Sequence, residues 1–219
     1  MGIETIQSVH TLPVTKVQFS TEGRKQVGIL GGNFNPVHVT HLIVADQVGR
    51  SLGLDRVDLM PSFIPPHVDP KETIDANHRL AMLELAVAGN SMLGIETIEL
   101  TRGGTSYTYE TMLTLKEANP DTDYYFIIGG DMVDYLPKWH RIDELMTLVQ
   151  FVGVKRPNYP QETSYSVIWV DVPLMELSST IVRSKTAQGC SIRYLVPETV
   201  RQYIIEKGLY QDDRTTNEI

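Results

Sequence analysis

Two histidines, three residues apart, follow a glycine turn near the start of the chain. The run from Gly31 to His41 reads GGNFNPVHVTH, and it comes directly after a short apolar stretch that ends at Leu30. Glycine lets a backbone approach a bulky ligand closely, and the first turn of a helix offers N–H groups and a positive dipole end to an anion. Two imidazoles at that place add donors for phosphate oxygens. The pattern predicts a site for a nucleoside triphosphate that works without a P-loop lysine.

A second pattern that suits phosphate lies near residue 180. Ser178, Ser179 and Thr180 come just before a predicted helix, where their hydroxyls would cap the first turn beside free N–H groups. Arg183 lies four residues after Ser179, on the same helix face, and a guanidinium binds phosphate oxygens in a fork. Serine and threonine caps are common, so this run is also compatible with a plain helix cap.

Strand and helix patterns alternate along most of the chain, and these elements must position the two motifs. We expect strands at 27–30, 57–60, 95–100, 124–128, 148–154 and 166–170, and helices at 41–52, 76–88, 107–118, 142–147, 178–185 and 197–207. This alternation predicts an α/β fold, with a doubly wound, mainly parallel, Rossmann-like sheet covered by helices on both faces. Ligands of such sheets bind at the carboxyl ends of the strands, where the turns after Leu30 and Ile128 lie.

Composition limits the classes of protein and partner. The 219 residues suffice for one domain at 25–212, preceded by an extension at 1–24 and followed by a tail at 213–219. A net charge of −8 argues against general affinity for nucleic acid. The lone Cys190 suits a reducing compartment, and no apolar run approaches the length of a membrane span. We expect a cytoplasmic protein that binds neither nucleic acid nor a membrane. The oligomeric state stays open, and a homo-oligomer is compatible with the sequence.

The histidine pair allows other readings. Two histidines at this spacing suit half of a zinc site, but no further ligands follow with metal-ligand spacing, so we assign no residue of the chain to a metal. Both rings are also compatible with a purely capping role. The dinucleotide-binding fingerprint GxGxxG is absent.

Several motifs, in order along the chain, resemble those of one family. The run GGNFNPVHVTHL resembles the (T/H)xGH signature of the nucleotidylyltransferase superfamily, in a form close to bacterial nicotinate mononucleotide adenylyltransferases, and LSSTIVR resembles their ISSTxxR motif. Further matches are PPH for the PPHK loop, RGGTSYT for GxSYT, FIIGGD for IIGxD, PKWH for PxWxx, and VGVKRP for the stretch on the adenosine side. Thr40 stands where the signature has glycine, so its side chain either crowds the phosphates or adds its hydroxyl to them.

The resemblance implies a nucleotidylyltransferase fold and a reaction in NAD biosynthesis. ATP and nicotinate mononucleotide would give nicotinate adenine dinucleotide and pyrophosphate, with Mg²⁺ bound through the ATP phosphates. The attacking phosphate oxygen is already anionic, so catalysis would depend on positioning and on stabilising charge. Nicotinamide mononucleotide or pantetheine phosphate as acceptor, and a nucleotide-binding module without turnover, are the alternatives.

The resemblance also assigns site residues. The catalytic residues would be His38, His41 and Arg183. The ATP-binding residues would be Gly31, Gly32, Asn33, Phe34, His38, His41, Gly129, Asp131, Arg156, Ser178, Ser179, Thr180 and Arg183. The nicotinate-nucleotide-binding residues would be Asn35, His67, Tyr107, Thr108, Trp139 and His140, with Trp139 stacked on the pyridine ring.

Overall fold

The computed structural model describes residues 23–64, 73–155, 163–173 and 175–211. Most of the 1–24 extension, His67 with its neighbouring prolines, Arg156 and the 213–219 tail lie outside the described residues, so the predictions for them stay predictions.

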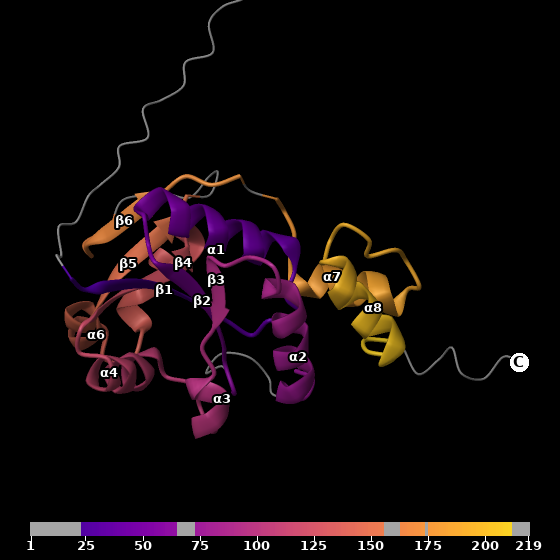
Figure 1. Ribbon diagram of the computed structural model, residues 1–219, viewed down its shortest axis with the longest axis horizontal. Coiled ribbons are helices and arrows are strands. Elements are labelled where there is room, and N and C mark those ends of the chain that lie inside the picture. Colours follow the sequence, from indigo (N-terminus) through magenta and orange to yellow (C-terminus); the bar gives the residue numbers. More distant parts are fainter. Residues whose placement is uncertain (1–22, 65–72, 156–162, 174, 212–219) are drawn as a thin grey trace, which may run out of the picture.

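Six parallel strands in the described part of the chain form one sheet in the order β3-β2-β1-β4-β5-β6 (Figure 1). The strands are β1 (Lys25–Gly32), β2 (Arg56–Pro61), β3 (Leu93–Ile95), β4 (Thr122–Gly129), β5 (Val149–Val154) and β6 (Val167–Val170). Each neighbouring pair runs parallel. The strand order reverses between β1 and β4, and such a switch point is where sheets of this kind bind ligands. The predicted doubly wound parallel sheet is confirmed.

Helices cover both faces of the sheet (Figure 1). One core contains buried side chains from α1 (Val39–Leu52), α2 (Ala76–Val87), α7 (Ser179–Ala187) and α8 (Glu198–Glu206). The other contains buried side chains from α4 (Thr108–Ala118), α5 (Gly130–Val133), the short helix η2 (Leu136–Lys138) and α6 (Ile142–Leu148). Because both faces are covered, the central strand β4 is apolar without a break from Tyr124 to Ile128, and all five of these residues are buried.

The segment 95–100, predicted as one strand, is divided, and the strand prediction was wrong over most of it. β3 ends at Ile95 and α3 (Ile98–Arg102) begins three residues later. The Glu96 carboxylate accepts a hydrogen bond from the backbone N–H of Ile98 at 2.9 Å. This bond satisfies a donor that the new helix leaves without a partner, and so favours a helix start over a longer strand.

We expect Gly153→Ala to destabilise the sheet. Gly153 pairs with Trp169 across β5 and β6, and a Cβ at position 153 would lie 2.8 Å from two atoms of the Trp169 ring. Overpacking of this kind should lower the free energy of unfolding by about 1–3 kcal/mol. Urea unfolding measures the change, with Ser166→Ala, an exposed position before β6, as the control. Equal stability of the Gly153→Ala protein and the wild type would contradict this packing.

Candidate active site

The segment 33–38, which we call the histidine loop, joins β1 to α1 at the switch point. The two glycines before it leave no room for a side chain. A Cβ at Gly31 would lie 3.1 Å from the Phe126 ring, and one at Gly32 would lie 3.1 Å from the Phe34 ring. Phe34 has a positive φ of 48°, which places its ring under Gly32 and edge-on to His41, with 4.9 Å between ring centroids. A positive φ is uncommon for a residue other than glycine.

The two imidazoles stack on each other at the start of α1. Their centroids are 3.7 Å apart and their planes meet at 23°. The backbone N–H of His38 donates to Nδ1 of His41 at 3.2 Å, so the proton of a neutral His41 lies on Nε2. The Nε2–H group of His41 takes no part in the bond with the His38 backbone, so it is available to a phosphate oxygen.

Burial keeps both rings neutral. It lowers the pKa of His38 to about 4. It also lowers the pKa of His41 well below the usual value, and the nearby His38 lowers it further. At pH 7 the pair therefore offers N–H donors and no positive charge.

The first turn of α1 has fewer free backbone N–H groups for an anion than the sequence predicts. The N–H of Val39 donates to the carbonyl of Leu195 at 3.0 Å, and the N–H of His41 donates to the carbonyl of His38 at 3.0 Å. The imidazoles are therefore the main donors at this helix start. Thr40 is 8% exposed, and its hydroxyl has no hydrogen-bond partner among the described residues. Both expectations for its side chain stay predictions.

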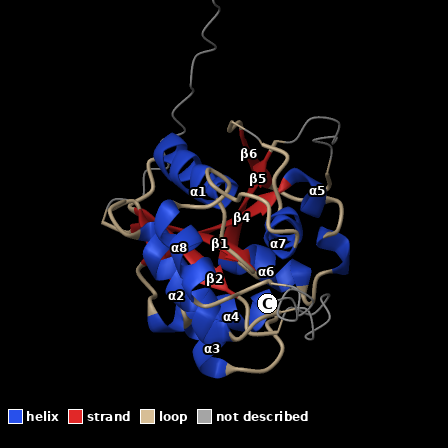
Figure 2. Ribbon diagram, turned by 90° about the vertical axis from the view of Figure 1, so that its right-hand side faces the viewer, coloured by secondary structure: helices blue, strands red, loops and turns tan. Residues whose placement is uncertain are grey.

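Helix α7 docks on the histidine loop, and in Figure 2 it lies in front of the sheet. The Ser179 hydroxyl donates to the carbonyl of Pro36 at 2.8 Å, and Nη1 of Arg183 donates to the carbonyl of Asn35 at 2.8 Å. These two acceptors lie just before His38 in the chain. The two predicted phosphate-binding motifs, more than 140 residues apart in sequence, therefore meet at one loop.

The start of α7 has a side-chain cap, which is compatible with both the plain cap and the phosphate-binding interpretation of the sequence. The Ser178 hydroxyl accepts from the N–H of Ile181 at 3.3 Å, and Nη2 of Arg183 donates to the Thr180 hydroxyl at 3.3 Å. Gly129 and Asp131 lie at the carboxyl end of the neighbouring strand β4, both half-buried. The predicted ATP-binding residues that the structure describes therefore come from the ends of β1 and β4, the histidine loop, the start of α1, and α7 with its cap.

Of the residues predicted on the nicotinate side, Tyr107, Thr108, Trp139 and His140 lie near the start of α4. Tyr107 and Thr108 form the start of α4, and the ring of Tyr107 lies 4.9 Å from the ring of His140. Nε2 of His140 lies 3.1 Å from the carboxylate of Glu110, in the first turn of the same helix. Trp139 is half-buried and sits edge-on to Phe126 and Phe151, so part of its indole belongs to the core.

Two predicted contact residues use their side chains inside the protein. Phe34 and Asn35 are each 2% exposed. Oδ1 of Asn35 accepts a hydrogen bond from the Tyr210 hydroxyl at 2.9 Å. Both side chains support the histidine loop, so a contact of either residue with a substrate would involve its backbone.

Comparison with known proteins agrees with this geometry. Residues 29–185 match the cytidylyltransferase-like family. The chain is 70% identical over 190 residues to an Enterococcus faecalis protein named "Probable nicotinate-nucleotide adenylyltransferase", with 87% of each chain covered. The chain belongs to the nicotinate-nucleotide adenylyltransferase family. A Streptococcus pneumoniae protein of the same name is 65% identical over 202 residues, which cover 90% of this chain and 97% of that protein.

A solved structure agrees on the fold of this adenylyltransferase family member. The Plasmodium falciparum nicotinic acid mononucleotide adenylyltransferase complexed with NaAD superposes with a TM-score of 0.73 at 19% identity, covering 85% of this chain and 97% of that one. The predicted nucleotidylyltransferase fold is therefore confirmed, and the family resemblance read from the motifs is confirmed by the two bacterial relatives.

Sequence reasoning missed two residues of this adenylyltransferase that hold the histidine loop. Arg79 on α2 is 1% exposed and donates to the carbonyl of Asn33 at 2.9 Å. Its position three residues before Met82 places it in the buried stripe of the helix, and an arginine in such a stripe is a signal that the sequence offers. Tyr210 has no such local signal, because its partner Asn35 lies 175 residues away.

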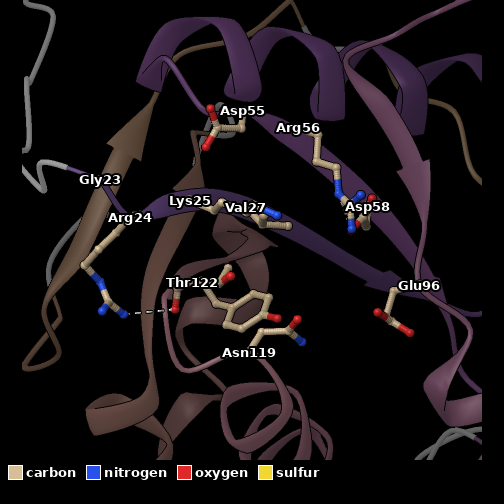
Figure 3. A pocket seen from close by; sticks show the side chains of 11 residues that line it. Gly23, Arg24, Lys25, Val27, Asp55, Arg56, Asp58, Glu96, Asn119 and Thr122 are labelled. Carbon is tan, nitrogen blue, oxygen red and sulfur yellow. Dashed lines mark hydrogen bonds and ion pairs between the residues drawn. The ribbon is translucent and has the colours of Figure 1, made fainter.

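A hollow of about 600 Å³ lies at the opposite, amino-terminal edge of the sheet (Figure 3). Arg24, Arg56, Asp58, Glu96 and Tyr124 are among its lining residues, and none of the predicted site residues lines it. The hollow is therefore separate from the adenylyltransferase motifs. No helix in the described ranges is long and apolar enough to span a bilayer.

The buried neutral histidines should make the stability of this adenylyltransferase depend on pH. Unfolding returns His38 from a pKa of about 4 to the ordinary value near 6.5, so the unfolded chain binds more protons. The stabilisation is complete above pH 6.5 and is lost as the pH falls toward 4. We expect His38→Gln to reduce the loss of unfolding free energy between pH 7.5 and pH 4.5 by about 2–3 kcal/mol.

Urea unfolding at the two pH values measures this difference. His140→Gln is the matched control, because His140 is exposed, and it should show the wild-type loss. An unchanged loss in His38→Gln would show that the His38 ring is not held neutral by the fold.

Proposed function

We propose that this protein transfers the adenylyl group of ATP to nicotinate mononucleotide, giving nicotinate adenine dinucleotide and pyrophosphate. The observation that carries the proposal is the docking of Ser179 and Arg183 on the carbonyls of the histidine loop. It brings the imidazole donors and a guanidinium to one place at the switch point of the sheet. The family of the chain supports the same reaction.

The reaction needs donors and positioning more than a base. An anionic oxygen of the mononucleotide phosphate attacks the α-phosphorus, and the bond to the bridging oxygen breaks, so that pyrophosphate leaves with the electron pair. His38 and His41 would donate N–H groups to phosphate oxygens as charge develops. Arg183 would bind the departing phosphates with Ser179 and Thr180 at the start of α7, because only part of its five-donor guanidinium is spent on Asn35 and Thr180.

We place Mg²⁺ on the ATP phosphates. Within the described ranges, no group of three or more histidine, cysteine, aspartate or glutamate side chains is arranged to hold a metal ion. Imidazole, guanidinium and hydroxyl groups at the site suit phosphate, whereas Mg²⁺ takes oxygen ligands and keeps several waters. The ion would neutralise charge on the phosphates. Asp131 is the carboxylate that we propose for the ATP ribose or for a metal-bound water.

The start of α4 is the proposed site for the nicotinate carboxylate. The helix has 11 residues, and no side chain caps its first N–H groups. Free N–H groups and the positive end of the helix dipole favour an anion there. Trp139 and His140 lie beside this helix start through the contact of His140 with Tyr107. We also propose a cytoplasmic location, which the exposed free thiol of Cys190 supports.

We expect His41→Ala to lower kcat by about 10²–10³-fold, the usual effect of losing one donor to developing charge. Pyrophosphate release from ATP and nicotinate mononucleotide measures it. His78→Ala is the control, because the His78 ring bonds the Tyr203 hydroxyl on α8 at 2.9 Å and takes no part in the imidazole stack. Near-normal turnover in a folded His41→Ala protein would remove His41 from the mechanism.

The acid form of the mononucleotide should be the better substrate. An amide would set its NH₂ group against the N–H donors of α4 and leave them unpaired, at a cost of about 1–3 kcal/mol. We therefore expect kcat/KM for nicotinate mononucleotide to exceed that for nicotinamide mononucleotide by about 10- to 100-fold. Comparable values would refute the carboxylate site, and faster turnover of pantetheine phosphate would replace the proposed acceptor.

A further inference from the structure

Arg79 is a buried cation whose hydrogen-bond acceptors in the structure are backbone carbonyls. Nη1 donates to the carbonyl of Asn33 at 2.9 Å and to that of Ser62 at 2.7 Å, and Nη2 lies 3.4 Å from the carbonyl of Phe63. The residue is 1% exposed, and burial lowers its pKa. Burying a guanidinium costs free energy, and an apolar side chain would fill the same space at lower cost. The positions of these three carbonyls therefore indicate the role of Arg79.

Its acceptors belong to two different loops of the site. Asn33 is in the histidine loop, on the ATP side. Ser62 and Phe63 begin the segment after β2, which leads toward His67, and we call residues 62–64 the mononucleotide loop. A backbone bond from the N–H of Ser62 to the carbonyl of Gly32, at 3.0 Å, ties the same two loops at their roots.

Hydrogen bonds also join the mononucleotide loop to the residue before α4, on the side predicted to bind nicotinate. The N–H of Phe63 donates to the Ser106 hydroxyl at 3.0 Å, and the N–H of Ser106 donates to the carbonyl of Ile64 at 3.0 Å. Ser106 directly precedes Tyr107 and hydrogen-bonds to the buried carboxylate of Glu99. A continuous chain of hydrogen bonds thus runs from Asn33 through Arg79 to the start of α4.

We propose that Arg79 is a positioning residue that fixes the histidine loop and the mononucleotide loop relative to each other, so that ATP and nicotinate mononucleotide each favour binding of the other. This inference rests on the proposed function. In-line attack requires the two substrates to meet within a fraction of an ångström, and small misplacements cost large factors in rate. A substrate that orders one loop orders the second through the guanidinium, and such coupling is reciprocal.

A second tie from the same region holds Asn33 by its side chain. Nδ2 of Asn33 donates to the Thr73 hydroxyl at 3.0 Å, just before α2 begins. Asp75 caps that helix by accepting from the N–H of Asn77 at 2.8 Å. The start of α2 therefore fixes Asn33 through both its backbone and its amide, and Thr73→Val removes one tie without touching the buried charge.

Calorimetric titration of the full chain tests the coupling. The dissociation constant of α,β-methylene-ATP, which cannot release pyrophosphate, is measured with Mg²⁺ in the absence and presence of saturating nicotinate mononucleotide. We expect the wild-type ratio of the two constants to be at least about five, within the usual range of coupling between sites. In Arg79→Lys the ratio should fall to about one, because a single ammonium does not reproduce the planar fork that spans both loops.

Steady-state kinetics of Arg79→Lys should show a larger change in kcat than in KM. We expect Arg79→Lys to lower kcat by about 10²-fold through misplaced substrates. Arg50→Lys is the matched control, because Arg50 is exposed on α1 and pairs only locally with Asp46, and it should keep both the ratio and kcat. If Arg79→Lys does not fold, Thr73→Val decides, with an expected fall of at least about twofold in the ratio.

Three results would overturn the inference: a wild-type ratio of one, a folded Arg79→Lys protein with the wild-type ratio, or, where that variant does not fold, an unchanged ratio in Thr73→Val. Binding of nicotinate mononucleotide alone is measured in a separate titration of the mononucleotide into the same proteins. Its absence would refute the proposed function, and this inference with it. Its presence together with an unchanged ratio in the variants would refute the inference alone.

Discussion

The carbonyl oxygens of Asn35 and Pro36 join the two motifs that the sequence predicts to bind phosphate. They accept hydrogen bonds from Arg183 and Ser179, and these bonds join α7 to the histidine loop, which leads into the helix start that carries His41. Without them the fold would present two separate helix starts. Because the acceptors are backbone atoms, the arrangement depends on the path of the histidine loop, which the buried Phe34 ring and the close contacts at Gly31 and Gly32 determine.

The histidine loop has neutral imidazoles on one side and arginine side chains on the other. On one side the imidazoles are neutral, because burial outweighs any gain from a positive charge. On the other side lie Arg79 and Arg183, with the Tyr210 hydroxyl near both guanidinium groups, where burial raises its pKa. In a chain with a net charge of −8, two arginines, Arg79 and Arg183, thus donate to carbonyls of this one loop. This local arrangement, rather than overall charge, suits a polyphosphate.

Much of the fold can be predicted from the sequence, because parallel strands buried on both faces must be apolar and must alternate with helices. β4 and α4 follow that rule within two residues of their predicted bounds. The strand prediction failed around Glu96 because the apolar pattern there suits a strand, whereas the Glu96 carboxylate satisfies the N–H of Ile98 at the start of α3. The two motifs predicted to bind phosphate could be picked out as well, since glycine turns, paired histidines and a Ser-Ser-Thr cap are local patterns.

Tertiary structure alone decided how these pieces meet. The sequence by itself determined the sheet, the helix starts and the kinds of donor placed at strand ends, because each depends on neighbours within a few residues. It did not reveal that Asn35 turns its amide to Tyr210, that Leu195 takes the first N–H of α1, or that Arg79 bridges two loops. Those bonds join groups far apart along the chain, so no local pattern records them, and they form only when the segments that carry them pack together.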